Sequence, residues 1–438
     1  IKAIDAAYTA WNPWKSLTGK DRAHIIRKWH ELILENIDDL SLIMTLENGK
    51  PFNDAKGEIN YASWFTDWFA EEAKRTYGKT IPTTVSGRRI LTIKQPVGVC
   101  GIITPWNFPA AMITRKVAPA LAAGCTVVIK PAGTTPYTAT ALVELAHRAG
   151  VPKGVINLVS VSEEKVSDVG DELCNNQKVR KISFTGSTNV GKILIAKTAS
   201  TIKRVSMELG GHAPFIVFED ADIDEAIIGA MANKYRNSGQ VCVSANRIYV
   251  HENIHDEFSS KLAKKSSELI VADGQKEGAQ IGPLITMAAV EKVQDHVSDA
   301  RSKGAKIITG GELDNEGRQF YKPTVMTDVT NDMKIFYEET FGPVAPLIKF
   351  SNDEEVIQMA NDTNYGLAGY FFSKDIGRIW RVAEALEYGM IGVNAGVIST
   401  EVAPFGGIKE SGVGREGATE GLDEYLEIKY ICFDGISN

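Results

Sequence analysis

The N-terminal part of the chain has the apolar pattern of helices. Between positions 24 and 52 (HIIRKWHELILENIDDLSLIMTLENGKPF) apolar residues recur at three- and four-residue spacing, which is the period of a helix with one buried face. Gly49 and Pro51 close this stretch, as glycine and proline commonly do at helix ends. The pattern therefore predicts helices from Ile1 to about Tyr77.

Between Arg88 and Ala111 the pattern changes to that of strands, with Gly98, Pro105 and Pro109 as breaks. Beyond this stretch, short apolar strands alternate with helices of about ten residues. Such alternation predicts an α/β fold of the Rossmann type, with a parallel sheet covered by helices on both faces. In this architecture nucleotides bind beyond the carboxyl ends of the strands.

The same alternation restarts after about Gly211, so we expect a second α/β domain. One strand of this domain follows Cys242 in the segment 234–250 (KYRNSGQVCVSANRIYV), where the cysteine lies between a glycine turn and an apolar run. The segment 423–433 (DEYLEIKYICF) alternates like an exposed edge strand. An exposed edge invites pairing with another chain.

The composition is that of a globular protein with more than one domain. A chain of 438 residues exceeds the size at which one hydrophobic core keeps growing. The net charge of −7 argues against a nucleic-acid-binding surface. The longest apolar run, at positions 117–129, is too short to span a membrane. No signal peptide is visible and the chain opens inside a helical pattern, so we expect a cytoplasmic protein and leave an organellar targeting segment open.

Odd and scattered cysteines are not the pattern of a disulfide framework, so we expect a reducing compartment. The five are Cys100, Cys125, Cys174, Cys242 and Cys432. Four of them lie in apolar or helical settings and are predicted to be inert buried thiols, Cys242 being the exception. His251 and His255 are the one histidine pair at helical spacing, and no third ligand is near in sequence. No metal site is expected.

Two residues suit attack on a carbonyl group. A thiol such as that of Cys242 attacks as thiolate, which backbone N–H groups and cations favour. Asn107 lies on a proline-bounded loop (TPWNFP, 104–109), where its amide could face a developing oxyanion or simply cap a turn.

Three further positions suit cofactor binding or acid–base chemistry. Ser187, in the strand–turn–helix segment 184–192 (FTGSTNVGK), could hold a pyrophosphate at a helix N-terminus, although such turns also merely connect elements. Glu208, at a strand end before two glycines, is a candidate general base or a solvated glutamate. In EETFGPV, Glu339 could accept hydrogen bonds from a ribose and Phe341 could pack on a flat ring, or the segment is a surface turn.

Seven short motifs occur in the order and spacing of the aldehyde dehydrogenase superfamily, which the chain resembles from end to end. They are NFP, KPA, FTGST, MELGG, NSGQVC, EETFGPV and PFGG. The resemblance implies an aldehyde dehydrogenase-like fold with three parts and assembly into a homodimer or homotetramer. The implied parts are a cofactor-binding domain (1–77 and 98–210), a catalytic domain (211–403) and a small oligomerisation sheet (78–97 and 422–438).

The resemblance also implies roles for single residues. Cys242 adds to the aldehyde, Asn107 and the Cys242 amide form an oxyanion hole, and Glu208 activates the water that hydrolyses the thioester. The implied cofactor-binding residues are Trp106, Lys130 (ribose), Gly133, Gly186, Ser187 (phosphates), Glu339 and Phe341.

Within the superfamily, the chain is most similar to the succinate-semialdehyde dehydrogenases, through WNFPAAMITRK, YRNSGQVC, PFGGIKESGVGREG and DEYLEIKY. This similarity implies NAD(P)-dependent oxidation of succinate semialdehyde, whose distal carboxylate would be held by Arg115, Arg236 and either Ser399 or Thr400. A guanidinium fork matches the two oxygens of a carboxylate. An ordinary exposed helix arginine is the alternative for Arg115.

Two departures from the family pattern change the expectations. Gly133 stands where NAD-preferring relatives often carry glutamate, so we expect NADP or NAD with a lean to NADP, against which Glu163 and Glu164 weigh. Ser244 stands where many relatives have a second cysteine, so a disulfide from Cys242 to that position is impossible.

Other functions stay open at this point. The same arginines would serve glutarate semialdehyde or another aldehyde, and an enzyme of this kind can also pass its acyl group to coenzyme A. A catalytically silent structural or binding protein on the same fold is the alternative from a different class.

Overall fold

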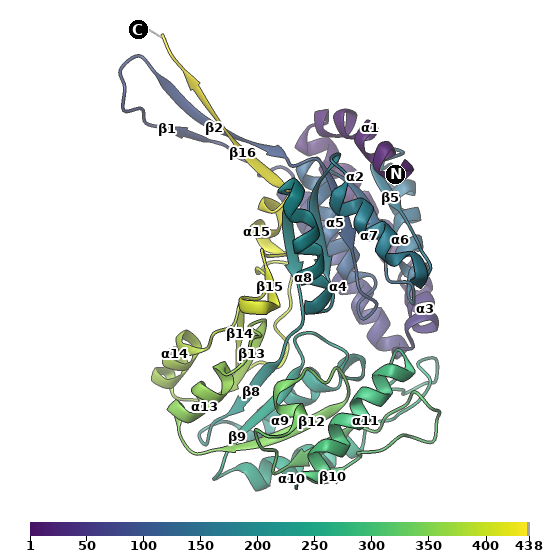
Figure 1. The fold of residues 1–438 in the computed structure, drawn as a ribbon, viewed down its shortest axis with the longest axis vertical. Coiled ribbons are helices and arrows are strands. Elements are labelled where there is room, and N and C mark those ends of the chain that lie inside the picture. Colours follow the sequence, from purple (N-terminus) through teal and green to yellow (C-terminus); the bar gives the residue numbers. More distant parts are fainter. Residues whose placement is uncertain (436–438) are drawn as a thin grey trace.

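The computed structural model describes residues 1–435, which form two largely parallel sheets with their helices and a projecting three-stranded arm (Figure 1). The first sheet has the strand order β15-β7-β6-β3-β4-β5, and all its neighbouring strands are parallel except β15. Its strands are β3 (Val99–Ile103), β4 (Thr126–Lys130), β5 (Ile156–Leu158), β6 (Val179–Thr185), β7 (Arg204–Glu208) and β15 (Gly412–Val413).

Helices cover both faces of the first sheet, as the alternating pattern predicted. Side chains of β3 alternate between the two faces: Cys100 and Ile102 pack with α2, α4, α5 and α6, whereas Val99 and Ile103 pack with α1, α7 and α8. The helices of this part are α1 (Lys2–Ser16), α2 (Gly19–Glu35), α3 (Ile37–Asn48), α4 (Phe52–Glu72), α5 (Ala111–Ala123), α6 (Pro136–Arg148), α7 (Val166–Asn175) and α8 (Thr188–Thr198). Gly49 ends α3 in the left-handed conformation (φ 88°), so the predicted helix end is confirmed.

The second sheet has the strand order β10-β11-β12-β9-β8-β13-β14 and is parallel except for β10. Its strands are β8 (Ala213–Val217), β9 (Ala245–His251), β10 (Lys306–Thr309), β11 (Thr324–Thr327), β12 (Val344–Phe350), β13 (Ala368–Phe372) and β14 (Met390–Val393). Helices α9 and α10 cover one face, and α11, α13 and α14 cover the other. The helices of this part are α9 (Ile223–Lys234), α10 (His255–Ser267), α11 (Met287–Ser302), α12 (Lys334–Tyr337), α13 (Asp353–Asn361) and α14 (Ile376–Ala385).

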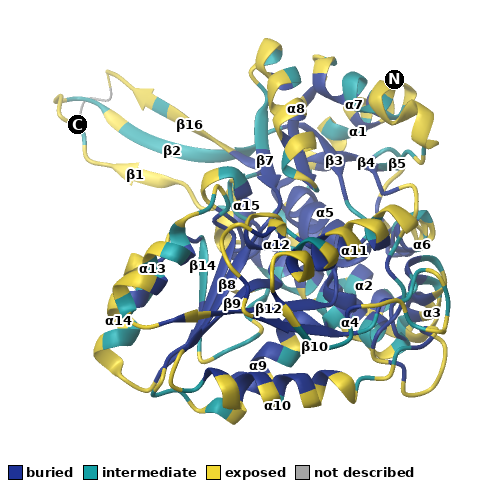
Figure 2. Ribbon diagram, turned by 60° about the horizontal axis from the view of Figure 1, so that its bottom comes forward, coloured by how far each residue is buried: buried dark blue, intermediate teal, exposed yellow. Residues whose placement is uncertain are grey.

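The C-terminal segment returns to the first sheet before it enters the arm. Strand β15 pairs with β7, and α15 (Ala418–Asp423) leads into β16 (Leu426–Phe433). In the arm, β16 pairs antiparallel with β2 (Arg89–Pro96), which also pairs with β1 (Lys79–Ile81). The prediction of an exposed edge strand is confirmed. Figure 2 shows the outer strands β1 and β16 of the arm mostly exposed and the middle strand β2 mostly of intermediate burial. Residues 436–438 of the predicted oligomerisation segment lie outside the described part of the chain.

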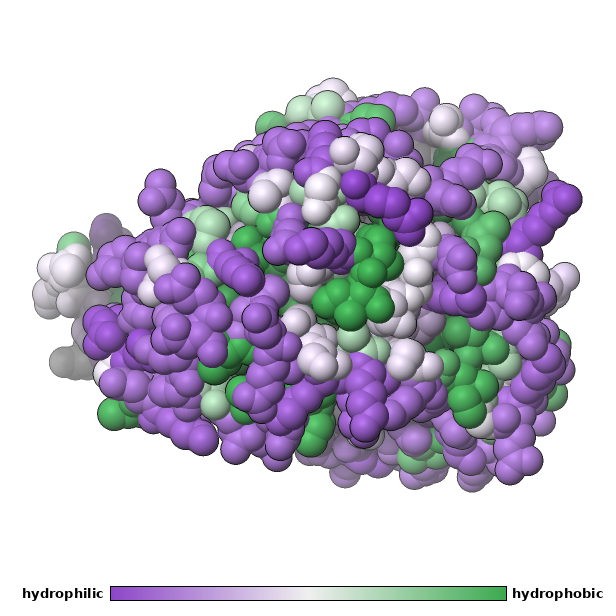
Figure 3. All heavy atoms as spheres, turned by 90° about the horizontal axis from the view of Figure 1, so that it is seen from below, coloured by the Kyte–Doolittle hydropathy of each residue, from purple (hydrophilic) through white to green (hydrophobic). Residues whose placement is uncertain are grey.

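Hydrophilic side chains dominate the face seen from below in Figure 3, with apolar ones in scattered groups. Among residues 1–435, no helix is both long enough and apolar enough to cross a membrane.

Candidate active site

A cavity of about 300 Å³ lies where the two sheets meet. The carboxyl ends of β6 and β7 reach it from the first sheet, and the loops that precede β9 and β12 reach it from the second. Its lining combines residues predicted from the sequence with others that were not. These residues include Trp106, Asn107, Thr185, Gly186, Ser187, Gly210, Cys242, Lys292, Glu339, Thr340 and Phe341.

Cys242 lies in a tightly wound loop between α9 and β9, three residues before β9 begins. Asn237 and Ser238 have left-handed backbone angles (φ 49° and 56°), which cost energy in residues other than glycine. Gly239 is required sterically, because a Cβ atom there would lie 2.1 Å from the carbonyl oxygen of Gly342. The loop leaves Cys242 partly accessible, whereas all of β9 is buried.

The surroundings of Cys242 disfavour its thiolate. Burial raises the pKa of the Cys242 thiol to about 12, and Glu339 and Glu208 add to this effect against Arg115 and Arg236. The two arginines favour the thiolate, as expected for cations near the loop, but burial and the two acids outweigh them. A base must take the proton before the sulfur can attack.

Asn107 is held against the Cys242 loop. Its Nδ2 donates to the carbonyl of Gln240 (3.1 Å), and its Oδ1 accepts from the N–H of Phe108 (3.1 Å). The amide therefore caps its own turn and also reaches the loop of Cys242. Because an amide nitrogen has two hydrogens, one donor remains for an oxyanion.

A buried ion pair that the sequence did not reveal fixes the Asn107 turn. The Lys50 ammonium lies 2.5 Å from Glu58 and also donates to the carbonyl of Asn107 (2.8 Å). Glu58 in turn accepts from the N–H of Ala110 (2.9 Å) just before α5, where a carboxylate favours the helix N-terminus. Both side chains are 1% exposed, so the pair is fully desolvated.

Glu208 ends β7 as a buried carboxyl group. It is 3% exposed, and its Oε2 has no hydrogen-bond partner among residues 1–435. Burial and the nearby Glu416 raise the pKa of Glu208 well above its usual value, while Arg115 and Lys116 oppose them. A solvated strand-end glutamate is therefore excluded, and the environment is that of a general base.

Glu416 is a second buried carboxylate that the sequence reasoning missed. It pairs with Arg115 Nε at 2.6 Å and with the Lys116 ammonium. These cations lower the pKa of Glu416 despite its burial, so it stays charged beside Glu208. The one available signal was two adjacent basic residues inside an otherwise apolar helix.

Arg115 is not the exposed helix arginine of the alternative interpretation. Its side chain is 1% exposed, and its Cζ lies 4.1 Å from the ring centre of Phe405. Its Nη1 lies 3.4 Å from the hydroxyl of Tyr61. Arg115 therefore contacts the hydroxyl of Tyr61, which lines a cavity that Arg115 itself does not line, and is bound to Glu416.

Arg236 lines a second cavity of about 260 Å³ on the other side of the Asn107 turn. Its Cζ lies 5.3 Å from the ring centre of Phe108, and it forms no ion pair with any acid in the described part of the chain. Ser399 lines the same cavity. Thr400 lines a different cavity and donates to Glu401 (3.0 Å), so only one of the two predicted hydroxyls faces Arg236.

Two aromatic rings and a carboxylate form one end of the main cavity. Trp106 and Phe341 meet edge to face with ring centres 5.7 Å apart. Oε1 of Glu339 accepts from the N–H of Gly211 (3.2 Å), and burial raises the pKa of Glu339 to about 7. The surface-turn alternative for this segment is therefore excluded.

The turn between β6 and α8 forms the other end. Ser187 caps α8, and Gly186 must be glycine because a Cβ atom would lie 2.4 Å from the ring of Phe184. The buried hydroxyl of Thr185 lacks a partner among residues 1–435. Lys130, whose pKa is lowered by burial, and the exposed Gly133 follow β4 and do not line this cavity.

The other cysteines are unpaired in the described chain. Cys100, Cys125 and Cys174 are buried, as predicted. Cys432 is exposed, which corrects the prediction of a buried thiol, because β16 lies at the edge of the arm.

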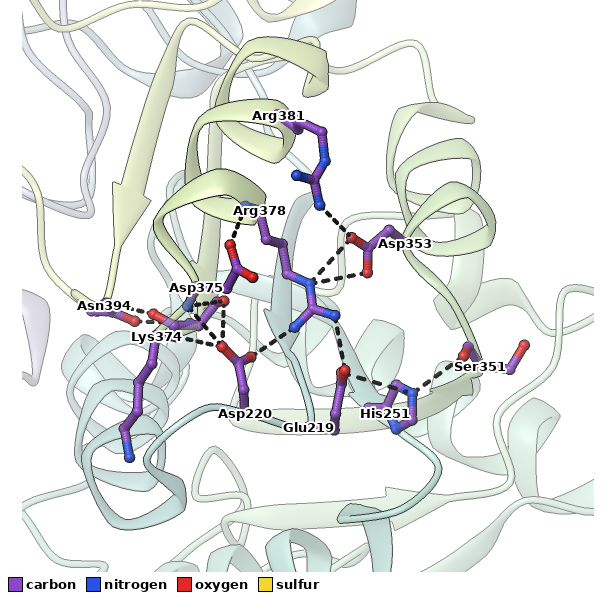
Figure 4. Close-up of polar contacts among 11 residues, drawn as sticks. Glu219, Asp220, His251, Ser351, Asp353, Lys374, Asp375, Arg378, Arg381 and Asn394 are labelled. Carbon is purple, nitrogen blue, oxygen red and sulfur yellow. Dashed lines mark hydrogen bonds and ion pairs between the residues drawn. The ribbon is translucent and has the colours of Figure 1, made fainter.

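A separate polar network lies at the carboxyl ends of the second sheet (Figure 4), where several of its residues line a cavity of about 500 Å³. The Arg378 guanidinium pairs with Glu219 (2.8 Å), Asp220 (2.8 Å) and Asp353 (3.1 Å). Asp220 also accepts from the hydroxyl of Ser373 (2.9 Å). Every nitrogen of the guanidinium therefore faces a carboxylate of the chain itself.

Comparisons with known proteins agree with this arrangement. The aldehyde dehydrogenase family matches residues 1–431. The chain is 58% identical to a glutarate-semialdehyde dehydrogenase of Pseudomonas putida, over 98% of this chain and 89% of that protein. It is 56% identical to an NADP(+) succinate-semialdehyde dehydrogenase of Escherichia coli, with the same two coverages. The crystal structure of an NADP-dependent Escherichia coli enzyme superposes with a TM-score of 0.97 at 56% identity, over 99% of this chain and 89% of that one. The chain belongs to the aldehyde dehydrogenase family.

Proposed function

We propose that this protein oxidises succinate semialdehyde to succinate with NADP or NAD. The observation that carries the proposal is Arg236, a guanidinium without a carboxylate partner in the described chain. It lines a cavity with Phe108, and the adjacent Asn107 lines the cavity of Cys242. An aldehyde with a distal carboxylate would place its anion at Arg236 and Ser399 and its carbonyl group at Cys242. Arg115 would support the same anion from behind Tyr61.

The main cavity fits a nicotinamide dinucleotide. Trp106 and Phe341 offer apolar walls for a flat ring, and the Glu339 carboxylate can accept from ribose hydroxyls. The unpartnered hydroxyl of Thr185 and the turn at Ser187 suit phosphate oxygens at the N-terminus of α8. When bound, this cofactor supplies the acceptor for a hydride.

Lys130 and Gly133 are proposed for the adenosine side of the cofactor, and the lean to NADP rests on the absence of a carboxylate at Gly133. The related Escherichia coli enzyme that carries NADP(+) in its name also supports it.

The residues of the chain divide the reaction into two steps. Glu208 takes the thiol proton of Cys242, the sulfur adds to the aldehyde carbon, and Asn107 Nδ2 with the Cys242 N–H stabilises the oxyanion. Loss of hydride leaves a thioester on Cys242. After Glu208 has released the first proton to solvent, it takes a proton from water, whose oxygen adds to the thioester carbon. The C–S bond then breaks, and Glu208 gives this proton to the departing sulfur as the acid is released.

We also propose the division into a cofactor-binding domain (1–77 and 98–210), a catalytic domain (211–403) and an oligomerisation sheet (78–97 and 422–438). The exposed edge of β16 supports pairing with a second copy, as a homodimer or homotetramer. The unpaired cysteines support a reducing compartment such as the cytoplasm.

Glutarate semialdehyde is the second candidate substrate, since a glutarate-semialdehyde dehydrogenase is among the relatives. The test is kcat/KM for succinate semialdehyde, glutarate semialdehyde and butanal, each with NADP and with NAD. We expect either semialdehyde to exceed butanal by about 100-fold, as expected for a charge-assisted contact. A higher kcat/KM for butanal than for either semialdehyde would refute an anion-binding pocket. A higher kcat/KM for glutarate semialdehyde than for succinate semialdehyde would make glutarate semialdehyde the proposed substrate.

A further inference from the structure

One face of α11 packs along the segment 334–342, which carries Glu339 into the cofactor cavity. The Lys292 ammonium, on this face, donates to the carbonyl oxygen of Glu339 (2.6 Å). The next residue, Val293, leaves no space above Gly342, because a Cβ atom there would lie 2.5 Å from its side chain. The loop is therefore in tight contact with the helix at both positions.

His296, on the same face of α11, holds the middle of this loop. It is 1% exposed, with Nδ1 at 3.1 Å from the hydroxyl of Thr340 and Nε2 at 3.2 Å from the carboxylate of Glu338. Burial lowers the pKa of His296, so the ring is neutral near pH 7 and has one N–H. A carboxylate only accepts, so Nε2 carries the hydrogen and Nδ1 accepts from the hydroxyl of Thr340.

The residue anchored in this way lies between the two side chains proposed to contact the cofactor. Thr340, 2% exposed, separates Glu339 from Phe341. Phe341 has a φ of 58°, a conformation that is costly for a residue with a side chain and persists only where neighbours enforce it. A fixed Thr340 therefore determines where both neighbours point.

We propose that His296 is a positioning residue for the cofactor: by holding Thr340, it fixes Glu339 and Phe341 in the cavity. The proposal rests on the proposed use of a nicotinamide dinucleotide. His296 does not line the cavity, so it acts through Thr340. Its removal should weaken cofactor binding and leave unchanged the second cavity, in which Arg236 and Ser399 would hold the distal end of the aldehyde.

The test is to measure the Kd of NADP and of NAD for the full chain without aldehyde, with tryptophan fluorescence as the signal of binding. His296→Leu and Thr340→Val each remove one end of the hydrogen bond, and each should raise the Kd about 5–10-fold. The double variant should be no weaker than the weaker single variant, because both remove the same contact. Thr340→Ser keeps the hydroxyl and should bind within about twofold of the wild type.

His255→Leu is the matched control, because it removes a histidine of α10 that is 2% exposed and distant from the cavity lining. It should leave the Kd unchanged. The KM for the aldehyde at saturating cofactor should also stay unchanged in His296→Leu. If His296→Leu does not fold, the cofactor Kd of Thr340→Val is compared with that of Thr340→Ser instead.

Unchanged cofactor Kd values in His296→Leu and Thr340→Val would overturn the proposal. An equal rise in cofactor Kd and aldehyde KM would overturn it as well, since it would indicate general loosening. A wild-type protein that bound neither NADP nor NAD would refute the proposed function itself, a result distinct from either of these.

Discussion

The two parallel sheets turn opposite edges toward the active site. In the first sheet, the carboxyl ends of β3, β6 and β7 carry Asn107, Ser187 and Glu208, as expected for open α/β sheets. In the second sheet, the amino ends face the cavity, and Cys242 and Glu339 come from the loops before β9 and β12. One site thus combines the usual binding edge of one sheet with the opposite edge of another.

The polar groups at the carboxyl edge of the second sheet pair with one another. There the charges of Arg378 and Asp220 are satisfied within the chain (Figure 4). At the first sheet, by contrast, Glu208 Oε2 and the Thr185 hydroxyl are buried without partners in the described chain. The first sheet therefore leaves polar groups available at its carboxyl edge, whereas the second sheet engages the corresponding groups within the chain.

The largest expected effect follows removal of the nucleophile at the amino edge of the second sheet. Cys242→Ala should lower kcat for succinate semialdehyde by about 10⁴-fold or more, because no other thiol is near the cavity. Cys432→Ala, on the exposed arm, is the control and should keep full activity. Substantial turnover by Cys242→Ala would contradict the assignment of the nucleophile to the second sheet.

Removal of the free guanidinium should affect one class of substrate. Arg236→Gln should raise KM for succinate semialdehyde about 10–100-fold and leave KM for butanal nearly unchanged, because only the first substrate carries an anion. Steady-state kinetics at saturating cofactor measures both values. Equal changes for the two aldehydes would show that Arg236 has a structural role.

The pH dependence of thiol reactivity sharpens the assignment of a base. With the Cys242 pKa raised to about 12, the thiolate fraction at pH 8 is far below that of a free cysteine of pKa about 8.5. Alkylation of Cys242 by iodoacetamide without cofactor should therefore be at least about 10-fold slower than that of glutathione, and its rate should still rise with pH at pH 10. A plateau below pH 9 would contradict a buried, protonated thiol.

The smallest effect on activity is expected at the carboxyl edge of the second sheet, where Arg378 pairs with three acids. Arg378→Met leaves Glu219, Asp220 and Asp353 facing one another, so we expect a loss of about 1–3 kcal/mol in the free energy of unfolding with kcat unchanged.

Against the effect of burial, hydrogen bonds from the Lys374 N–H, the Ser373 hydroxyl and the Asp375 N–H, together with the charge of Arg378, lower the pKa of Asp220. The contribution of Arg378 is therefore present above the unfolded pKa of about 4 and is lost as the pH falls through the lower folded value. The variant should therefore lose less stability than the wild type between pH 5 and about pH 2, as denaturant titrations can measure. A fall in kcat without a fall in stability would show that this edge takes part in the reaction.

Much of the fold could be predicted from the sequence because many elements carry an apolar pattern in their residues. The run ANRIYVH is wholly buried as β9, and the alternation in DEYLEIKYICF is that of the edge strand β16. The motif residues Cys242, Asn107 and Glu339 were also located, since each stands beside a turn residue at the end of an element.

The buried charges could not be predicted, because pairing depends on residues far apart in the chain. Glu416 and Lys116 are 300 positions apart, and no local pattern joins Lys50 to the carbonyl of Asn107. The protonation of Cys242 was likewise missed, since burial and two acids outweigh the nearby arginines only in three dimensions. The distinction between Ser399 and Thr400 needed the turn that sends them into different cavities.

The most direct test asks whether the two sheet edges act on one molecule. Glu208→Gln keeps the size of the side chain but removes the base, so hydrolysis should become slow relative to acylation at high pH, where the thiol ionises without help. After mixing with succinate semialdehyde and NADP, mass spectrometry of the quenched variant should find a succinyl group on the peptide that contains Cys242, together with one equivalent of NADPH. An unmodified Cys242, or the acyl group on another residue, would contradict the account.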